Sequence, residues 1–315
     1  MTRQLVSIAL CTYNGAAYLR EQLDTLVDQT YPDCEIIAVD DCSKDNTVEI
    51  LREYALSYPR IKVYVNTENL GYTKNFEKAI SLCNGEYIAL CDQDDIWDKY
   101  KITIMLGHIG NHILAYHDSA FMDEQGNPLH KKISDVRNCY SGNDSRVFLF
   151  ENCVLGHAIL FKRELLNFTG SFNDTVIHDR WLAYVATNNG GIVFVDQPLV
   201  QYRQHINANT NILLQERANK SKSSSIYKMQ FQLDIVKVLV DYPFNADLPF
   251  KKKLLSLMQK RMRSYTSFTL AYFIFIHRDV LLYIPKKSFV SKINLILKYI
   301  WGYKLKQLSL FNIDR

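Results

Sequence analysis

The sequence predicts an α/β protein with a mainly parallel, doubly wound sheet, followed by a helical C-terminal extension. Up to about residue 95, short apolar runs rich in β-forming residues alternate with amphipathic helical patterns. Polar residues follow directly after several of these runs, as ligand-binding residues do at the carboxyl edge of an open α/β sheet. The last ninety residues lose this alternation and mix Lys and Arg with Leu, Ile, Phe, Tyr and Trp.

The first part of the chain contains four expected strands and three expected helices. The strands are Leu5–Leu10, Glu35–Val39, Ile61–Val65 and Tyr87–Cys91. Between them, apolar residues recur on one helical face in three groups: Leu19, Leu23 and Leu26; Val48, Leu51 and Ala55; and Phe76, Ala79, Ile80 and Cys83. This order of elements is the βαβ pattern of a parallel sheet.

The remaining chain divides into two further regions. From about Ile113 to Gln204 the helical alternation weakens, and a turn at residues 123–127 suggests a mixed sheet with long loops. A Lys/Ser-rich stretch at residues 220–225 is the expected boundary. We therefore expect a domain over residues 1–215, with halves 1–97 and 98–215, and a basic helical region over residues 226–315.

Composition and charge restrict the class of protein. A chain of 315 residues with 48% hydrophobic and 22% charged residues has enough apolar material for a folded core, which excludes a disordered protein. The net charge of +4 is too small to indicate nucleic-acid binding, and no recognised binding motif accompanies the basic residues. We expect no nucleic-acid partner.

The expected location is cytoplasmic, with the alternative of peripheral attachment to the inner face of the cell membrane. The seven cysteines form no C-x-x-C pair and several lie in apolar runs, which favours a reducing compartment. The apolar run near the N-terminus is too short for a signal peptide. The apolar stretch Phe268–Ile276 is far shorter than the roughly 20 residues of a membrane-spanning helix.

The segment GEYIALCDQDDIW places three carboxylates, those of Asp92, Asp94 and Asp95, at the end of a buried strand. Carboxylates are ligands that suit Mg²⁺ or Mn²⁺, and crowding them is electrostatically unfavourable without a cation. An isolated D-x-D is more often a solvated turn, but its position at a strand end favours a metal site. Such a metal can stabilise charge on a departing phosphate.

A second acidic pair, Asp40 and Asp41, follows the strand in IIAVDDCSKDNT. A carboxylate there can accept hydrogen bonds from a base or from a ribose hydroxyl. The alternative is helix capping, since residues 43–46 include three capping residue types, and both roles are compatible. The loop at residues 12–15 has a single glycine and no G-x-G-x-x-G pattern, which argues against a dinucleotide-binding protein.

Four segments together resemble the family-2 glycosyltransferases of the GT-A fold: CTYNGAAYLREQLDTLVDQTY, AVDDCSKDNT, NLGYTKNFEKAI and NGEYIALCDQDDIW. The resemblance is specific over roughly residues 5–97 and continues more weakly to about residue 205. D-Q-D-D-I-W followed by H-D-R-W and Y-R-Q-H is most similar to bacterial rhamnosyltransferase-like members that build surface polysaccharides. The family resemblance implies a GT-A nucleotide-diphospho-sugar transferase fold and a divalent metal cofactor, Mn²⁺ or Mg²⁺.

The resemblance also implies roles for individual residues. Nucleotide contacts are implied for Thr12, Tyr13, Asn14, Asp40, Asp41, Lys74 and Asp92. Metal contacts are implied for Asp92, Asp94 and His205, with Asp94 the chief ligand. An acceptor-side location is implied for Gly156, His157 and Trp181. Many family members carry an arginine in the segment that here contains Lys74.

Inversion at the anomeric carbon requires a base on the acceptor hydroxyl, which the family supplies from a Glu-Asp motif. The matching pair here is His178 and Asp179, so Asp179 is the expected base. The alternative is that Asp179 only caps the helix that follows. His205 could equally be structural, and Arg203 could contact phosphate or form an ion pair.

The expected function is transfer of a sugar, with dTDP-rhamnose as the favoured donor and otherwise a UDP-sugar, onto a saccharide or a lipid-linked saccharide. Two alternatives are a sugar-nucleotide nucleotidyltransferase, which typically has a glycine-rich basic loop after the first strand, and a non-catalytic sugar-nucleotide-binding module. The basic aromatic C-terminal region is expected either to contact an anionic membrane or to pack as a helical cap on the catalytic domain.

Overall fold

The computed structural model describes residues 4–205 and 225–307. Its contacts divide the chain into two compact units. The first consists of Met1–Asp135, Cys139–Asn143 and Val154–Leu213, and the second of Val136–Asn138, Asp144–Cys153 and Leu214–Arg315. The boundary expected at residues 220–225 lies outside the described residues, except for Ser225 at the start of a helix.

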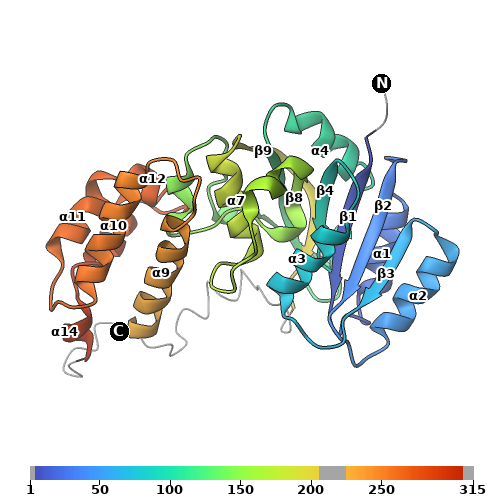
Figure 1. The fold of residues 1–315 in the computed structure, drawn as a ribbon, viewed down its shortest axis with the longest axis horizontal. Helices are drawn as coiled ribbons and strands as arrows, with labels where there is room; N and C mark the ends of the chain where they lie inside the picture. The colour runs from blue at the N-terminus through green and yellow to red at the C-terminus, as the bar shows by residue number, and fades with distance from the viewer. Residues whose placement is uncertain (1–3, 206–224, 308–315) are drawn as a thin grey trace. The chain divides into compact units, whose positions relative to one another are not determined.

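The first unit contains a sheet with nine strands among the described residues, in the order β3-β2-β1-β4-β8-β6-β9-β5, with β7 paired to β6 (Figure 1). The strands are β1 (Val6–Thr12), β2 (Cys34–Asp40), β3 (Ile61–Val65), β4 (Tyr87–Cys91), β5 (Ile96–Trp97), β6 (Leu114–Met122), β7 (Pro128–Lys132), β8 (Ile159–Lys162) and β9 (Ile192–Arg203). Strands β1 to β4 pair in parallel, whereas β8 pairs antiparallel with β4 and β6. The predicted α/β fold, with a parallel first half and a mixed second half, is confirmed.

Helices cover both faces of the sheet in the first unit. Apolar side chains of α1 (Leu19–Val27), α2 (Thr47–Ser57) and α4 (Lys101–Ile109) share one core with alternate residues of β1 and β2. Helix α3 (Tyr72–Leu82) packs against β1 and β2 and buries Phe76, Ala79 and Ile80. Because both faces are covered, β1 and β2 are buried along their whole length, which explains their nearly continuous apolar sequences.

Three further helices lie between the later strands of the first unit or near them. Their bounds are α5 (Ile133–Val136), which ends at the edge of the unit, α6 (Leu166–Thr169) and α7 (His178–Asn188). The turn expected at residues 123–127 is present, since the Asp123 N–H donates to the Asn127 carbonyl over 2.9 Å. This turn connects β6 to the exposed strand β7.

The second unit is helical, as the sequence predicts for the C-terminal region (Figure 1). Its helices are α9 (Ser225–Val240), α10 (Leu248–Arg261), α11 (Phe268–Ile276), α12 (Arg278–Leu281), α13 (Phe289–Leu297) and α14 (Tyr303–Gln307). The segment 144–153 belongs to this unit: the buried Lys251 ammonium donates to Ser145 Oγ over 2.6 Å and to Asn245 Oδ1 over 2.7 Å. None of the described helices is long and apolar enough to cross a membrane.

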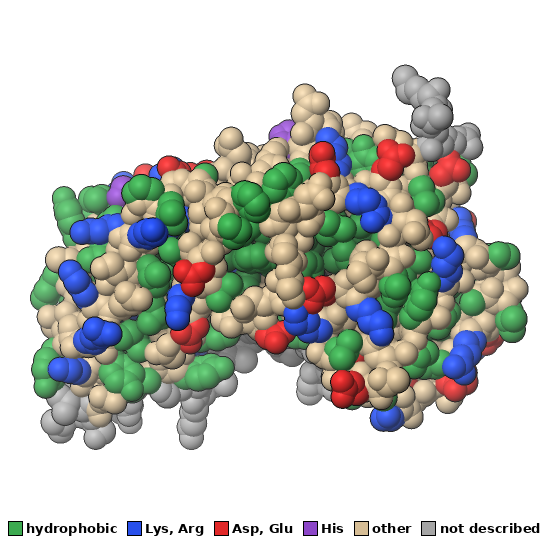
Figure 2. Space-filling model, viewed as in Figure 1, with side chains coloured by type: hydrophobic (Ala, Val, Ile, Leu, Met, Phe, Trp, Pro, Cys, Tyr) green, Lys and Arg blue, Asp and Glu red, His purple; other side chains and the backbone are tan. Residues whose placement is uncertain are grey.

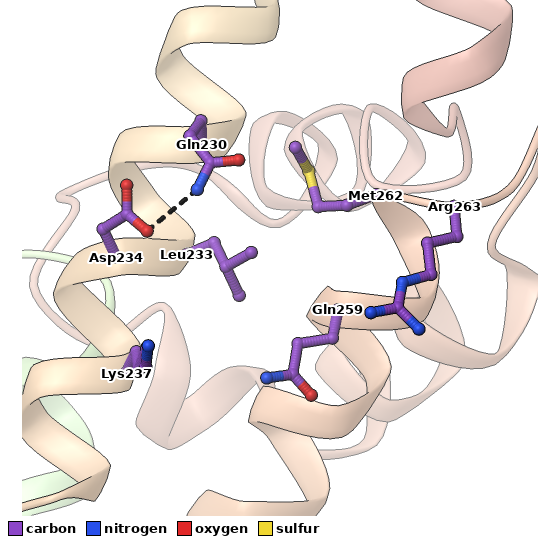
Figure 3. A pocket seen from close by; sticks show the side chains of 7 residues that line it. All are labelled: Gln230, Leu233, Asp234, Lys237, Gln259, Met262 and Arg263. Carbon is purple, nitrogen blue, oxygen red and sulfur yellow. Dashed lines mark hydrogen bonds between the residues drawn. The ribbon is translucent and has the colours of Figure 1, made fainter.

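A depression lies between α9 and α10 of the second unit (Figure 3). It is lined by Gln230, Leu233, Asp234, Lys237, Gln259, Met262 and Arg263. The lining includes one acidic residue, Asp234, and two basic residues, Lys237 and Arg263. The Gln230 side chain donates a hydrogen bond to Asp234 over 2.8 Å. These are features of an ordinary solvated surface between two helices.

Glu35 ties together β1, β2 and β3 at the edge of the sheet opposite to the strand ends discussed below. Its carboxylate accepts from Ser7 Oγ over 2.7 Å, from Lys62 Nζ over 2.9 Å and from the Asn84 N–H over 2.7 Å. Burial by itself would raise the pKa of Glu35, but the hydrogen bonds from Ser7, Lys62 and Asn84 outweigh it and lower the pKa to about 2. The ionised form is therefore favoured by folding.

Glu35→Gln is expected to lower the free energy of unfolding at neutral pH by about 1–2 kcal/mol. Because the folded pKa is depressed, this contribution is present above the unfolded pKa and is lost as the pH falls toward 2. Urea unfolding across this range should show a flatter acid limb for the variant. The exposed Glu86→Gln is the control, and equal acid sensitivity of Glu35→Gln and the wild type would contradict the assignment.

Candidate active site

Side chains from the ends of β1, β2 and β4 meet at the carboxyl edge of the sheet. Thr12 is paired in register with Asp40, and its hydroxyl donates to Asp40 Oδ2 over 2.8 Å. The Ser43 N–H and hydroxyl donate to the same carboxylate, over 2.8 and 2.5 Å. The neighbouring Asp45 accepts from the Thr47 N–H at the start of α2. Asp45 thus holds the start of α2, whose N-cap residue Asn46 makes no side-chain cap hydrogen bond, while Asp40 is buried beside Thr12.

Asp41 holds the loop that leads into α3. Its Oδ1 accepts from the Asn66 side chain and from the Leu70 N–H, both over 2.8 Å, and its Oδ2 accepts from the Gly71 N–H over 2.9 Å. Gly71 has a φ of 80°, a conformation that glycine adopts without strain. A nucleotide contact by Asp41 would be made in addition to these hydrogen bonds.

The first loop is linked to the acidic loop by Gln93, a residue that the sequence did not indicate. The Tyr13 N–H donates to Gln93 Oε1 over 2.8 Å, and Gln93 Nε2 donates back to the Tyr13 carbonyl over 3.1 Å. A Cβ at Gly15 would lie 2.2 Å from Gln93 Oε1, so this close approach requires glycine. Asn14, at a φ of 48°, accepts from the Lys44 N–H, and the Tyr13 ring stays exposed.

The acidic loop brings Asp94 against His205. The distance from Asp94 Oδ2 to His205 Nε2 is 2.9 Å, although the two residues are 111 positions apart. The His205 ring also lies 5.1 Å from the ring of Tyr18. Two of the expected metal ligands are therefore adjacent. The third, Asp92, is the most exposed of the three acidic residues, with a side chain 38% exposed against 16% for Asp94.

Arg203, at the end of β9, holds the acidic loop in place. Its N–H donates to Asp95 Oδ1 over 3.0 Å and its Nε to the Asp94 carbonyl over 2.9 Å. One guanidinium nitrogen pairs with Glu21 at 2.5 Å, and the other donates to the Glu124 carbonyl over 2.9 Å. The sequence left two roles open for Arg203, a phosphate contact or an ion pair. The side chain is buried and forms the ion pair.

A buried polar network lies beneath the acidic loop. Carboxylate and imidazole atoms of Asp92, Asp95 and His157 lie within 4.8 Å of one another and could hold a metal ion. His157 Nε2 lies 2.8 Å from Ser119 Oγ, and the Lys101 ammonium donates to the His157 carbonyl over 2.6 Å. Sequence analysis placed His157 on the acceptor side; the structure places it against the acidic residues.

Burial shifts the pKa values of this network in the directions that reduce its charge. Burial and the nearby Asp94 and Asp92 carboxylates raise the pKa of Asp95 well above its usual range. Burial lowers the pKa of Lys101 to about 7, with its ammonium 3.1 Å from the centre of the Trp97 ring. Asp95 Oδ2 has no hydrogen-bond partner among the described residues. Neither Asp95 nor Lys101 can be recognised as a network member from its local sequence.

The start of α7 carries the expected base. Asp179 is buried in the first turn and accepts from the Arg180 N–H, whereas the N-cap position is Ile177, without a side-chain cap. The charge of Asp179 contributes, after burial, to a raised pKa of Tyr72 at the start of α3. The rings of Tyr72 and His178, one at the start of each helix, lie 6.1 Å apart between centroids. Asp179 satisfies one helical N–H from its own helix.

His178 fills the space beside Asp179. Its ring stacks on Phe76 with 4.2 Å between centroids, and burial lowers its pKa to about 4 although the charge of Asp92 opposes the shift. A Cβ at Gly156 would lie 2.9 Å from His178 Nε2, so Gly156 is a packing requirement here. Trp181, also expected on the acceptor side, is buried and donates from its ring to the Thr169 carbonyl over 3.0 Å.

Lys74 is engaged in contacts within the first unit. Its ammonium contacts Glu77 Oε2 at 2.8 Å, the Phe172 carbonyl at 2.5 Å and Ser171 Oγ at 3.3 Å. An ammonium has three donors, and these partners occupy all of them. A phosphate contact by Lys74 would require it to leave these partners. Asp118, at the middle of β6, is fully buried and accepts from Ser134 over 2.6 Å, so it is not exposed to a substrate.

The chain matches the model of glycosyl transferase family 2 over residues 7–169, more than half of its length, and it belongs to this family. Among its relatives is the dTDP-rhamnosyl transferase RfbG of Shigella flexneri, 28% identical over 246 residues that cover 73% of this chain and 83% of that protein. The chain is therefore a glycosyltransferase, and not the nucleotidyltransferase or the non-catalytic module that the sequence left open.

Two solved structures share the fold. TarS 1-349 of S. aureus in complex with UDP-GlcNAc is 19% identical, with a TM-score of 0.58 over 81% of this chain and 71% of that chain. The mannosyltransferase PcManGT of Pyrobaculum calidifontis, in complex with GDP-Man and Mn²⁺, is 17% identical, with a TM-score of 0.55 over 99% and 89%. The expected GT-A fold is confirmed.

Arg203→Met is expected to lower the free energy of unfolding by about 2–4 kcal/mol, because it leaves Glu21 and two backbone carbonyls without their donor. Chemical denaturation of both proteins measures the difference. Arg52→Met, at an exposed site, is the matched control and should change little. A loss no greater in Arg203→Met than in Arg52→Met would show that the acidic loop does not depend on Arg203.

Proposed function

We propose that this glycosyltransferase transfers a sugar, with inversion, from a nucleoside-diphosphate donor to an acceptor hydroxyl. The observation that carries the proposal is the convergence of Asp92, the Asp94–His205 pair and Thr12–Asp40 at one edge of the sheet. In open α/β sheets this edge is where nucleotides bind. The donor is proposed to be dTDP-rhamnose, in line with the likeness to RfbG, and otherwise a UDP-sugar.

The proposed acceptor is a saccharide or lipid-linked saccharide in bacterial surface polysaccharide synthesis. The proposal rests on the combination of D-Q-D-D-I-W, H-D-R-W and Y-R-Q-H and on the rhamnosyl-transferring relative. The C-terminal region is proposed to contact an anionic membrane peripherally, which would place the enzyme where lipid-linked acceptors are located.

Asp92, Asp94 and His205 would hold a divalent cation, Mn²⁺ or Mg²⁺. The donor types fit, because carboxylate oxygens suit Mn²⁺ or Mg²⁺ and an imidazole nitrogen can add a further ligand, and Asp94 Oδ2 lies 2.9 Å from His205 Nε2. Among the described residues, however, the ligand atoms of Asp92, Asp94 and His205 do not all lie within 4.8 Å of one another, so Asp92 would have to move to complete this site. The Asp92, Asp95 and His157 group is the alternative. We favour Asp94 over Asp95 because the Asp95 side chain has no exposed surface that a diphosphate could reach. When bound, the cation would neutralise charge on the departing diphosphate.

Asp179 is proposed as the base. Its carboxylate would accept the proton of the acceptor hydroxyl as that oxygen forms a bond to the anomeric carbon and the bond to the diphosphate breaks. Asp179 is buried, so few water molecules can reach its carboxylate and compete with an acceptor hydroxyl. The Thr12–Asp40 pair and the exposed Tyr13 ring would bind the nucleoside.

Asp94→Asn is expected to abolish Mn²⁺-dependent turnover more completely than Asp95→Asn, because Asp94 is the proposed direct ligand. Turnover is measured as release of nucleoside diphosphate from dTDP-rhamnose and, in parallel, from UDP-GlcNAc over a series of Mn²⁺ concentrations. The two substitutions are equally conservative, so each controls for the other. Full Mn²⁺-dependent turnover in Asp94→Asn would exclude this metal assignment.

Asp179→Asn keeps shape and hydrogen-bonding capacity but removes the base, so turnover should fall by roughly 10²–10⁴-fold while donor binding survives. Calorimetry with donor and Mn²⁺ reports binding, and nucleoside diphosphate release in the presence of acceptor reports chemistry. The exposed Asp174→Asn, a few residues before α7, is the control. Near-normal turnover in Asp179→Asn would remove it from the mechanism, and loss of folding would assign it a structural role.

A further inference from the structure

Helix α11 of the second unit presents an apolar stripe to solvent. Its exposed apolar side chains are Phe268, Tyr272, Phe275 and Ile276, spaced as one helical face, and Thr269 is the one exposed polar residue of the helix. The opposite face, with Leu270, Ala271 and Ile274, is buried. A surface helix of a water-soluble protein normally has polar residues on its outer face. The outer face of α11 is therefore suited to an apolar environment.

Helix α13, which packs against α11, extends this stripe. Its exposed side chains include Phe289 and Val290, which are 61% and 67% exposed, and Leu297. The Arg278 guanidinium lies 5.1 Å from the ring centre of Phe275 and 5.8 Å from that of Phe289, so these rings from two helices share one cation. We name the exposed side chains of α11 and α13, with Arg278, Lys286 and Lys287, the α11–α13 surface.

The segment that carries this surface is strongly basic, although Lys251 and Arg261 within it are buried. Residues 248–307 contain thirteen Lys and Arg and one acidic residue, Asp279. Lys286 and Lys287 are exposed immediately before α13. In the space-filling view, Lys and Arg side chains alternate with hydrophobic ones over the helices of this unit (Figure 2). The depression between α9 and α10 differs, because Asp234 lies there among Lys237 and Arg263 (Figure 3).

We propose that the α11–α13 surface binds an anionic phospholipid bilayer, with its rings in the headgroup region and its cations on the lipid phosphates. Moving exposed apolar side chains from water into the membrane interface lowers the free energy, and each nearby cation adds electrostatic attraction to anionic lipids. Long Lys and Arg side chains can reach the phosphates while the rings insert. This proposal specifies which residues make the membrane contact that is part of the proposed function. It rests on the proposed function only for the reason to bind a membrane, which is access to a lipid-linked acceptor.

A second copy of the chain fits this surface less well than a bilayer does. Two copies joined through it would bring two sets of cations together with only Asp279 to offset them, and like charges across an interface are costly. An anionic lipid surface offers the opposite charge across the whole area. Charge complementarity therefore selects the bilayer as the occupant.

The test measures sedimentation of the full chain with vesicles of phosphatidylcholine, with and without phosphatidylglycerol. Tyr272→Ser/Val290→Ser removes two highly exposed apolar side chains, and Lys286→Glu/Lys287→Glu reverses two charges. Each is expected to weaken binding to the anionic vesicles by about tenfold or more. Binding to pure phosphatidylcholine should be weak for every protein.

The matched control is Tyr227→Ser/Phe231→Ser, which removes two exposed aromatic side chains from α9 of the same unit. It should bind vesicles like the wild type. Circular dichroism confirms folding, and donor calorimetry, which needs no membrane, separates a failure of this surface from a failure of the sugar-transfer proposal. Undiminished vesicle binding in both surface variants, or none in the wild type, overturns the proposal. Dimerisation that is lost in Tyr272→Ser/Val290→Ser would instead assign the surface to a second copy.

Discussion

The geometry of the acidic loop depends on one buried cation, that of Arg203. Three acidic residues follow β4 within four residues, and crowding them is unfavourable in a loop that is held only by its own backbone. Arg203 donates hydrogen bonds to the Asp94 carbonyl and to Asp95, and it pairs with Glu21. These contacts fix the acidic loop against the end of β9. His205, two residues further along the chain, contacts Asp94 of the same loop.

The buried network below the loop has an electrostatic cost that the fold reduces in two ways. Burial drives Asp95 toward its protonated form and Lys101 toward its neutral form, which removes much of the charge that would otherwise be left unsolvated. Part of the remaining polarity is satisfied locally, through the His157 carbonyl, the Ser119 hydroxyl and the face of Trp97, whereas Asp95 Oδ2 has no hydrogen-bond partner among the described residues. A rigid and nearly neutral support thus lies under the more exposed Asp92 and Asp94, the residues suited to contact a ligand.

The sequence predicted what depends on local pattern and missed what depends on tertiary contact. The four N-terminal strands and three helices were recognisable because alternation of apolar residues encodes them directly. The contact of His205 with Asp94 had a signal only through the family resemblance, because nothing local connects positions 111 residues apart. Gln93 had no signal at all, since its role follows from the close approach of another loop. For Lys74, the family resemblance implied a nucleotide contact, whereas three partners within the unit already occupy its ammonium.

The grouping of segment 144–153 with the C-terminal helices was equally invisible in the sequence, and it affects how the second unit can be studied. Phe148, Leu149 and Phe150 are buried, and Phe150 stacks on Tyr299 of the second unit with 5.6 Å between centroids. Removing the chain after about residue 226 would expose these side chains and leave Ser145 without the Lys251 donor. A truncated protein that failed to bind vesicles would then report a damaged fold and not a missing lipid contact. Substitution of exposed side chains on α11 and α13 leaves this shared core intact, so it isolates the surface from the unit that carries it.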